Sequence, residues 1–242
     1  MKKIKIYSDG AEKTSMLKMA KEPFISGFTT NPSLMKKAGL KDYAAFAKDI
    51  LESSPDKSFS FEVFADDFSG MLRQAKEINS WRKYSKSATN PIYVKIPITN
   101  SEGKSCIPLV KELAHSGVQL NVTAIFTTKQ VQETCDAVKG GAPSIVSVFA
   151  GRIADTGRDP MPMMRDYLKI CRAADPKNIE LLWASCREVL NIKQAEECGS
   201  DIITVPPEIL SKLAMAGRDL DKLSLDTVQM FRTDSLAAGF SI

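Results

Sequence analysis

Short apolar runs alternate with longer amphipathic stretches eight times along this chain. The apolar runs are rich in Val, Ile and Phe, which is typical of buried parallel strands. The expected strands are Lys3–Tyr7, Ile25–Phe28, Phe59–Phe64, Ile92–Ile96, Leu120–Ile125, Ile145–Phe149, Leu181–Ala184 and Ile202–Val205. The expected helices are Glu12–Ala20, Asp42–Ser53, Phe68–Trp81, Ser105–His115, Lys129–Lys139, Pro162–Ala173, Arg187–Cys198 and Pro207–Ala214. This alternation predicts βαβ units with a parallel sheet, and eight repeats favour an α/β fold of the (β/α)8 TIM barrel type.

An open, doubly wound sheet is the alternative architecture, but no Gly-x-Gly-x-x-Gly motif follows the first expected strand. The 242 residues match the length of one barrel, which is roughly 250 residues. No linker or low-complexity tract divides them, so residues 1–242 are expected to form a single barrel domain. Leu225, Val228 and Phe231 predict an extra C-terminal helix in the tail at about residues 224–242, which could pack on its own barrel or on a neighbouring subunit.

Composition narrows the classes of partner. The net charge is +4 and the Lys and Arg residues form no basic tract, which suits an anionic small molecule and does not indicate nucleic acid. The longest apolar runs are too short to cross a bilayer, so no membrane partner is expected. The N-terminus alternates polar and apolar residues and does not resemble a signal peptide, which predicts a cytoplasmic protein.

The cysteines and the single histidine argue against metal and triad chemistry. The five cysteines include no Cys-x-x-Cys pair, which favours reduced structural thiols over a disulfide scaffold or a zinc site. Zinc enzymes usually use two or three histidines, and His115 is the only one. Its surroundings, Leu113-Ala114-His115-Ser116-Gly117, are typical of a helix end away from a barrel's active site. The sequence therefore argues against metal hydrolysis and against histidine-based nucleophilic catalysis.

Polar residues fall at the carboxyl end of nearly every expected strand, where barrel enzymes hold their catalytic groups. In chain order they are Asp9, Thr29, Thr30, Asn31, Glu62, Lys95, Asn121, Thr123, Ser147, Arg152, Ser185 and Arg187.

Lys95 is the most informative of these residues. It lies in the apolar strand Ile92–Ile96, so its ammonium must point either into the barrel or toward the helices, and both places are desolvated. A buried ammonium is costly, and burial together with nearby cations favours the neutral amine, which can attack a carbonyl. A structural ion pair with a carboxylate such as Glu62 explains the residue equally well from spacing alone.

Two carboxylates and two arginines also have alternative interpretations. Glu62 inside a strand is either the partner of Lys95 or a proton shuttle serving an imine. Asp9, taken alone, is more simply explained as a cap for the helix expected from Glu12. Arg152 and Arg187 singly suit surface ion pairs, but together at one barrel mouth they suit a phosphate clamp.

The segment after the seventh expected strand adds to that clamp. Ser185 precedes Glu188 by three positions, which is the spacing of a capping box. A helix beginning near Arg187 would direct its N-terminal amides at the phosphate.

Several motifs resemble those of the transaldolase family. Gly27-Phe28-Thr29-Thr30-Asn31-Pro32-Ser33-Leu34 resembles the family's Thr-Thr-Asn-Pro-Ser signature, and Val94-Lys95-Ile96-Pro97 is similar to the segment with its Schiff-base lysine. Asn121-Val122-Thr123, Ser147–Ile153 and Ala184-Ser185-Cys186-Arg187 resemble its later blocks in the same order. The resemblance runs from Ile6 to about Leu213 and, given the short chain, is closest to the compact branch that also contains fructose-6-phosphate aldolases.

The resemblance implies a role for each of these residues. Lys95 forms the imine, Asp9 moves the proton of the C4 hydroxyl, and Glu62 and Thr123 hold a proton-carrying water. Asn31 and Asn121 bind the dihydroxyacetone portion, which Thr29 and Ser147 line, while Ser185, Arg187 and Arg152 hold the phosphate. The resemblance also implies a reaction without a cofactor or a metal, and a homo-oligomer, a pentamer or a decamer.

Two positions distinguish the branches within this resemblance. Fructose-6-phosphate aldolases tend to carry Gln in place of Glu62 and Tyr in place of Phe149, so the pair here resembles a true transaldolase. Cys186 departs from the family pattern and is expected to affect packing only. The expected activity is transfer of dihydroxyacetone from sedoheptulose 7-phosphate or fructose 6-phosphate to glyceraldehyde 3-phosphate or erythrose 4-phosphate, a reaction of the non-oxidative pentose phosphate pathway. The alternatives are a fructose-6-phosphate aldolase and a barrel that binds sugar phosphates without turnover.

Overall fold

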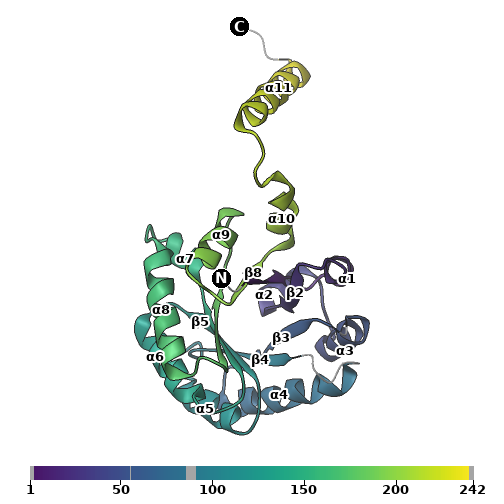
Figure 1. The fold of residues 1–242 in the computed structure, drawn as a ribbon. Coiled ribbons are helices and arrows are strands. Elements are labelled where there is room, and N and C mark those ends of the chain that lie inside the picture. Colours follow the sequence, from purple (N-terminus) through teal and green to yellow (C-terminus); the bar gives the residue numbers. More distant parts are fainter. Residues whose placement is uncertain (1–2, 55, 86–90, 240–242) are drawn as a thin grey trace. The chain divides into compact units, whose positions relative to one another are not determined.

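A closed parallel barrel forms the centre of the computed structural model, which describes residues 3–54, 56–85 and 91–239. Each strand pairs with the next in sequence order, and β8 pairs with β1, so the sheet has no open edge (Figure 1). The strands are β1 (Lys5–Asp9), β2 (Ile25–Thr29), β3 (Ser58–Glu62), β4 (Ile92–Pro97), β5 (Leu120–Ile125), β6 (Ser144–Val148), β7 (Ile179–Trp183) and β8 (Ile202–Val205). The expected (β/α)8 barrel is therefore confirmed.

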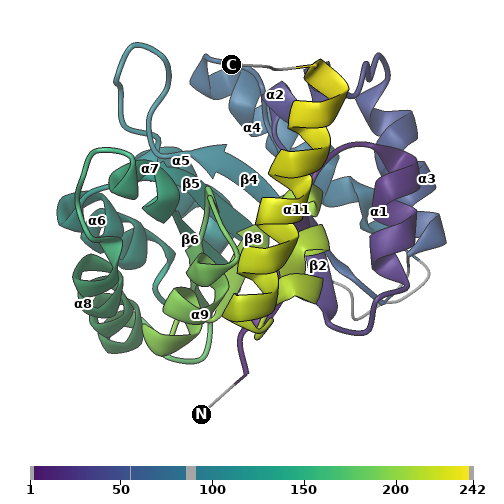
Figure 2. The same cartoon turned by 90° about the horizontal axis from the view of Figure 1, so that it is seen from above.

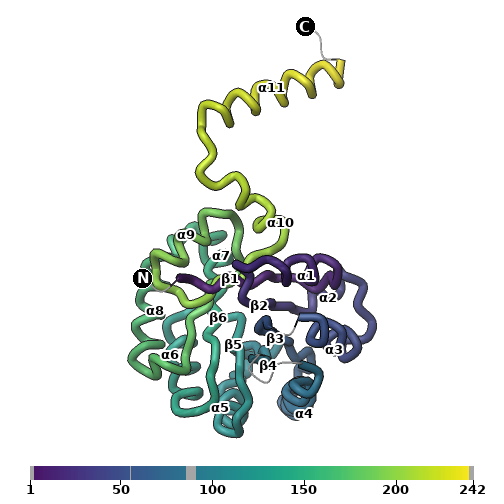
Figure 3. The backbone as a smooth tube through the Cα atoms, turned by 45° about the vertical axis from the view of Figure 1, so that its right-hand side comes forward, coloured from purple at the N-terminus to yellow at the C-terminus, as the bar shows by residue number. Residues whose placement is uncertain are grey.

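Helices lie outside the strands and cover the barrel, as the tube in Figure 3 shows for α3, α4, α5, α6 and α8. Up to residue 210 they are α1 (Lys13–Ala20), α2 (Pro32–Lys37), α3 (Tyr43–Ser53), α4 (Phe68–Ser80), the 3-10 turn η1 (Trp81–Tyr84), α5 (Ile107–His115), α6 (Thr128–Val138), α7 (Ala150–Ala154), α8 (Pro160–Ala174), α9 (Leu190–Glu197) and α10 (Pro207–Leu210). His115 ends α5 and is exposed, as expected. In the described ranges, no helix is long and apolar enough to cross a bilayer.

The residues from Ser211 onward form a second compact unit. It contains the 3-10 turn η2 (Ser211–Met215) and the helix α11 (Leu220–Ala238), the yellow helix of Figure 2. The Asp219 carboxylate caps α11 by accepting from the Lys222 amide, and Gly239 ends the helix in a left-handed conformation. The expected tail helix is thus present, but it begins at Leu220 instead of near residue 224, and residues 240–242 of that expectation lie outside the described residues.

Two short helices were not expected, and two elements lie elsewhere than predicted. The helices α2 and α7 have six and five residues, too few for a hydrophobic period to reveal them. The first strand was expected at Lys3–Tyr7 but runs from Lys5 to Asp9, so Asp9 belongs to β1. The helix expected from Arg187 begins only at Leu190.

The inner face of the barrel has an apolar layer between polar side chains at its two ends. Tyr7, Tyr93, Ile145, Leu182, Ala184 and Ile202 form one buried cluster. Below this cluster, Lys5 Nζ lies 2.7 Å from Glu180 Oε1. Because side chains alternate along a strand, the residues two positions after this layer point the same way. They include Asp9, Lys95, Ser147 and Thr204, so the apolar layer forms a floor beneath a polar mouth.

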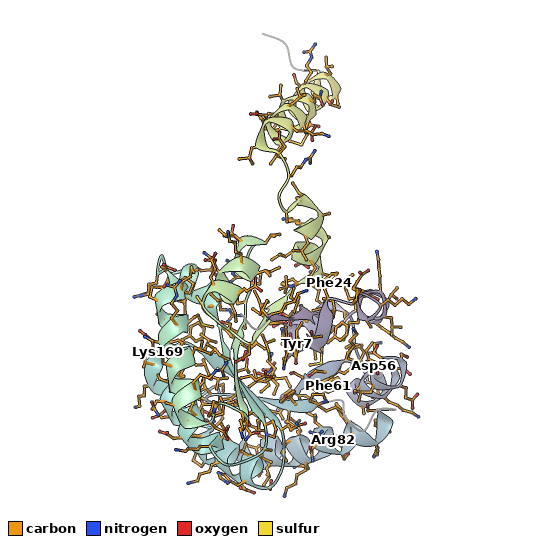
Figure 4. All side chains as sticks on the ribbon, viewed as in Figure 1. Tyr7, Phe24, Asp56, Phe61, Arg82 and Lys169 are labelled. Atoms are coloured by element: carbon orange, nitrogen blue, oxygen red, sulfur yellow. The ribbon has the colours of Figure 1, made fainter. Side chains whose placement is uncertain are left out.

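The outer faces of the strands pack against the helices. Phe61 on β3 makes edge contacts with Trp81 and Tyr43, and Phe59 stacks on Phe28. In Figure 4, Tyr7 and Phe61 lie on the strands, whereas Lys169 projects from the outer helix α8. This separation lets the inner face carry polar groups while the outer face supplies the hydrophobic core.

Candidate active site

One cavity of about 190 Å³ opens at the carboxyl end of the strands. Its walls contain nine of the expected site residues: Asp9, Thr29, Asn31, Lys95, Ser147, Phe149, Arg152, Ser185 and Arg187. Four further residues line it: Ala184, Cys186, Thr204 and Pro206. Residues spread over most of the sequence thus meet at one mouth, as parallel strands in a barrel require.

Lys95 lies at the base of this cavity and is 6% exposed. Its Nζ atom is 2.9 Å from Glu62 Oε2 and donates a hydrogen bond of 3.1 Å to the Thr30 carbonyl oxygen. Strand register fixes the pair, because Glu62 on β3 lies directly opposite Lys95 on β4. The ion pair considered from the sequence is therefore present, and it provides an acceptor for a proton of the amine.

Asp9 points into the cavity from the end of β1 and accepts a 2.7 Å hydrogen bond from Thr29 Oγ1. Burial raises the pKa of the Asp9 carboxyl above its usual value, while the Lys95 charge and the Thr29 bond lower it. The interpretation of Asp9 as a helix cap is wrong, because Glu12 caps α1 by accepting from the Thr14 and Ser15 amides. The carboxyl of Asp9 thus remains available for chemistry.

Asn121 and Thr123 on β5 are buried beside Lys95 and do not line the cavity. Asn121 lies opposite Lys95 in register and donates from Nδ2 to Ser60 Oγ at 3.0 Å. Among the described residues, Asn121 Oδ1 and Thr123 Oγ1 have no hydrogen-bond partner. Buried polar atoms of this kind are normally satisfied by a water or a ligand atom.

Asn31 is held at the cavity wall by the helix that follows it. Its Oδ1 atom accepts from the Leu34 amide at 3.0 Å and caps α2, with Pro32 at the first helical position. The cap uses one lone pair of Oδ1, so the Nδ2 donors of Asn31 and the second lone pair of Oδ1 are left for a ligand.

Two arginines also line the cavity, Arg152 on α7 and Arg187 after β7. The Arg152 guanidinium lies over the Phe149 ring, 5.0 Å from its centroid. Arg187 is about half exposed and forms an ion pair with Asp155, the residue that ends α7. Arg187 is not on a helix, so the expectation that helix amides would join it is wrong.

The segment after β7 is fixed by other contacts. Ser185 has a left-handed φ of 64°. The capping box considered from the sequence does not form, because the N-cap residue of α9 is Val189, which makes no side-chain hydrogen bond. Asn191 Oδ1 instead accepts from the backbone amides of Arg187 and Glu188 at 2.8 and 3.2 Å. These bonds hold Ser185 and Arg187 at the cavity.

Gly151 brings the helix α7 against this segment. Its amide donates to the Ala184 carbonyl oxygen, and a Cβ added at Gly151 would lie 1.6 Å from the Ser185 carbonyl oxygen. Only glycine permits so close an approach of two backbones. This contact fixes the spacing between Arg152 on α7 and Arg187.

Thr204 is a lining residue that sequence reasoning missed, and Cys186, which was expected to affect packing only, also lines the cavity. Thr204 stands near the end of β8, so the search for polar residues at strand ends would have found it. Burial raises the pKa of the Cys186 thiol to about 11, which keeps it protonated and a poor nucleophile near neutral pH. In the described part of the chain, no group of three or more His, Cys, Asp or Glu side chains could hold a metal ion.

Comparison of the sequence with known proteins gives consistent matches. The family model of transaldolase/fructose-6-phosphate aldolase matches residues 6–241. A probable transaldolase of Dehalococcoides mccartyi is 34% identical over 210 residues, which are 87% of this chain and 90% of the relative. A probable transaldolase of Chelativorans sp. is 36% identical over 87% of this chain and 88% of its own length.

Solved structures support the fold at low sequence identity. KGPDC from Streptococcus mutans superposes with a TM-score of 0.56 at 11% identity, covering 85% of this chain and 89% of that one. The tryptophan synthase A-subunit of Pyrococcus furiosus gives 0.58 at 10% identity, covering 91% and 94%. The match of the family model over nearly the whole length decides the family. This chain belongs to the transaldolase/fructose-6-phosphate aldolase family.

Proposed function

We propose that this chain is a transaldolase that transfers a dihydroxyacetone unit between sugar phosphates through a Schiff base on Lys95. The donors would be sedoheptulose 7-phosphate or fructose 6-phosphate, and the acceptors glyceraldehyde 3-phosphate or erythrose 4-phosphate. The observation that carries the proposal is the buried Lys95 amine, paired with Glu62 at 2.9 Å, at the base of a cavity that also contains Asp9 and two arginines.

The reaction begins at Lys95. After Lys95 gives a proton to Glu62, its neutral amine attacks the ketose carbonyl and forms a carbinolamine, which loses water to give the imine. Asp9 then takes the proton of the C4 hydroxyl, and the C3–C4 bond breaks with its electron pair moving into the enamine. The enamine attacks the acceptor aldehyde, Asp9 returns the proton, and water releases the new ketose.

The surrounding polar groups suit the bound three-carbon unit. Asn31 and Asn121 would bind its hydroxyl groups, with Thr29 and Ser147 along the same wall. Among the described residues, Thr123 Oγ1 has no hydrogen-bond partner, which supports a water held between Thr123 and Glu62. This water would carry protons while the carbinolamine forms and breaks down. No step draws on a cofactor or metal.

The phosphate of the sugar would lie against Arg152, Arg187 and Ser185. Arginine presents a planar fork of donors that fits phosphate oxygens, and Gly151 keeps the two arginines at one wall. Binding of this remote group positions the reacting carbons above Lys95.

Asp155 competes with the phosphate for Arg187. We expect Asp155→Asn to lower KM for fructose 6-phosphate by about twofold to fivefold, because an exposed ion pair of about 0.2 to 1 kcal/mol no longer has to be broken. Steady-state kinetics measure this change. The unphosphorylated ketose fructose is the control, since its KM should not change; an unchanged or higher KM for fructose 6-phosphate would contradict the competition.

Phe149 favours transfer over release of free dihydroxyacetone. An aldolase must protonate the enamine, and the Phe149 ring at the cavity wall carries no hydroxyl to help. We expect Phe149→Tyr to raise dihydroxyacetone release, without acceptor, by about tenfold, less than the ~10²–10⁴ of a fully positioned acid. An enzymatic assay of free dihydroxyacetone measures the release, with Phe149→Leu as the variant that lacks the hydroxyl. Equal effects of the two substitutions would refute the explanation.

Borohydride trapping with fructose 6-phosphate, followed by peptide mass spectrometry, tests the covalent mechanism. A dihydroxyacetone-sized adduct on Lys95 is expected, and exchange with an acceptor aldose phosphate then separates a transaldolase from a fructose-6-phosphate aldolase. Tight binding of sugar phosphates without an adduct or turnover would instead favour the non-catalytic barrel. The proposal includes that the protein is a cytoplasmic homo-oligomer and that it acts in the pentose phosphate pathway.

A further inference from the structure

Two threonines and an aspartate form a hydrogen-bond chain at one wall of the cavity. Thr29 Oγ1 on β2 lies 2.7 Å from Asp9 Oδ1 on β1, and it also lies 2.5 Å from Thr204 Oγ1 on β8. Thr29 is 3% exposed and Thr204 is 5% exposed, so neither hydroxyl can readily exchange its partner for bulk water. The strand β1 lies between β2 and β8 in the sheet, and the two hydroxyls meet inside the barrel.

The donor in each bond follows from counting protons. A threonine hydroxyl has one proton to donate and two lone pairs to accept with. An ionised Asp9 can only accept, so the one hydroxyl proton of Thr29 is used in that bond. The contact between the two threonines then requires Thr204 to donate and Thr29 to accept.

We propose that Thr204 is a positioning residue for the proton transfer, because its hydroxyl commits the single proton of Thr29 to the Asp9 carboxylate. This inference rests on the proposed function, in which Asp9 is the base. Thr204 lines the cavity, but its hydroxyl acts through Thr29 and has no direct bond to Asp9. Hydrogen bonds in a chain polarise one another, so the donation from Thr204 strengthens the donation from Thr29 to the carboxylate.

The chain affects when Asp9 is ionised. Burial, Glu62 on β3 and Glu208 on α10 oppose the ionised form, whereas the Lys95 ammonium on β4 and the Thr29 hydroxyl favour it. Asp9 must be ionised to take a proton, so activity rises with pH through the titration of this group. A weaker donor at Thr29 raises the pKa of Asp9 further and moves the rise in activity to higher pH.

The pH profile of kcat/KM for fructose 6-phosphate in the acceptor assay tests the inference in the full-length enzyme. Thr204→Val removes the hydroxyl while keeping the shape; the acid limb should move up by roughly half a pH unit, and kcat/KM on that limb should fall by up to about threefold. Thr204→Ser restores the donor and should return the limb to its wild-type position. Thr134→Val is the matched control, since the buried Thr134 hydroxyl bonds only the Gln130 carbonyl oxygen of α6 among the described contacts.

A double-mutant cycle separates positioning from packing. Thr29→Val should shift the limb further than Thr204→Val, and the double variant should match Thr29→Val alone, because Thr204 acts only through Thr29. A limb that stays in place in Thr204→Val, or shifts that add in the double variant, would overturn the inference. If the valine variant does not fold, Thr204→Cys, a poor donor of similar size, should give the same shift. A wild-type enzyme without transfer or aldol activity would instead refute the proposed function, since no pH profile could then be measured.

Discussion

Replacement of Lys95 by methionine is expected to abolish both dihydroxyacetone transfer and borohydride trapping. Methionine keeps the length and most of the volume of the side chain but has no amine to attack a carbonyl. We expect the transfer rate to fall by at least about 10⁴-fold, as for the loss of a nucleophile elsewhere. Steady-state exchange and mass spectrometry of the trapped peptide measure the two effects.

The partner of Lys95 requires a control for stability. Removing the ammonium leaves the largely buried Glu62 carboxylate unpaired, which is expected to lower the free energy of unfolding by about 3 kcal/mol. The double variant Lys95→Met with Glu62→Gln removes the charge as well, so it should unfold near the wild-type temperature and remain inactive. Measurable transfer in this stable double variant would eliminate Lys95 as the nucleophile.

Substitution of Gly151 by alanine is expected to weaken binding of the sugar phosphate at Arg152, Arg187 and Ser185 without displacing Lys95. The added Cβ would lie 1.6 Å from the Ser185 carbonyl oxygen, and a backbone atom cannot move aside as a flexible side chain can. The segment from Ser185 to Arg187 must therefore shift away from α7. We expect KM for fructose 6-phosphate to rise by about 10²-fold, as a displacement of about 1 Å can produce, while trapping of dihydroxyacetone on Lys95 persists.

Gly140→Ala is the matched control for this substitution. Gly140 ends α6 with a φ of 74°, at the amino-terminal end of the barrel, and a Cβ there meets no atom within 4 Å. Alanine in this conformation costs about 1 to 2 kcal/mol of stability but should leave KM unchanged. If Gly151→Ala also leaves KM unchanged, the close approach does not position the arginines.

Much of the barrel follows from local properties of the sequence. The strands Leu120–Ile125 and Ile202–Val205 lie where their apolar runs predicted, because strands buried on both faces are rich in Val, Ile and Leu. The lysine inside Ile92–Pro97 had to be desolvated whichever way it pointed, which singled it out before its partner was known. Polar residues at strand ends then predicted eight of the residues that line the cavity, and the family resemblance added Phe149.

Only the tertiary structure shows which of the interpretations that the local sequence allows is correct for a given residue. From the sequence, Asp9 was a suitable cap for the helix expected from Glu12, but in the structure Asp9 ends β1 and Glu12 itself caps α1. The tight contact of Gly151 with Ser185, the pair of Arg187 with Asp155, and the bond between Thr29 and Thr204 join residues 32 to 175 positions apart. Hydrophobic periodicity and capping rules describe neighbours along the chain. Contacts across the barrel depend on the register and spacing of whole elements, which packing alone fixes.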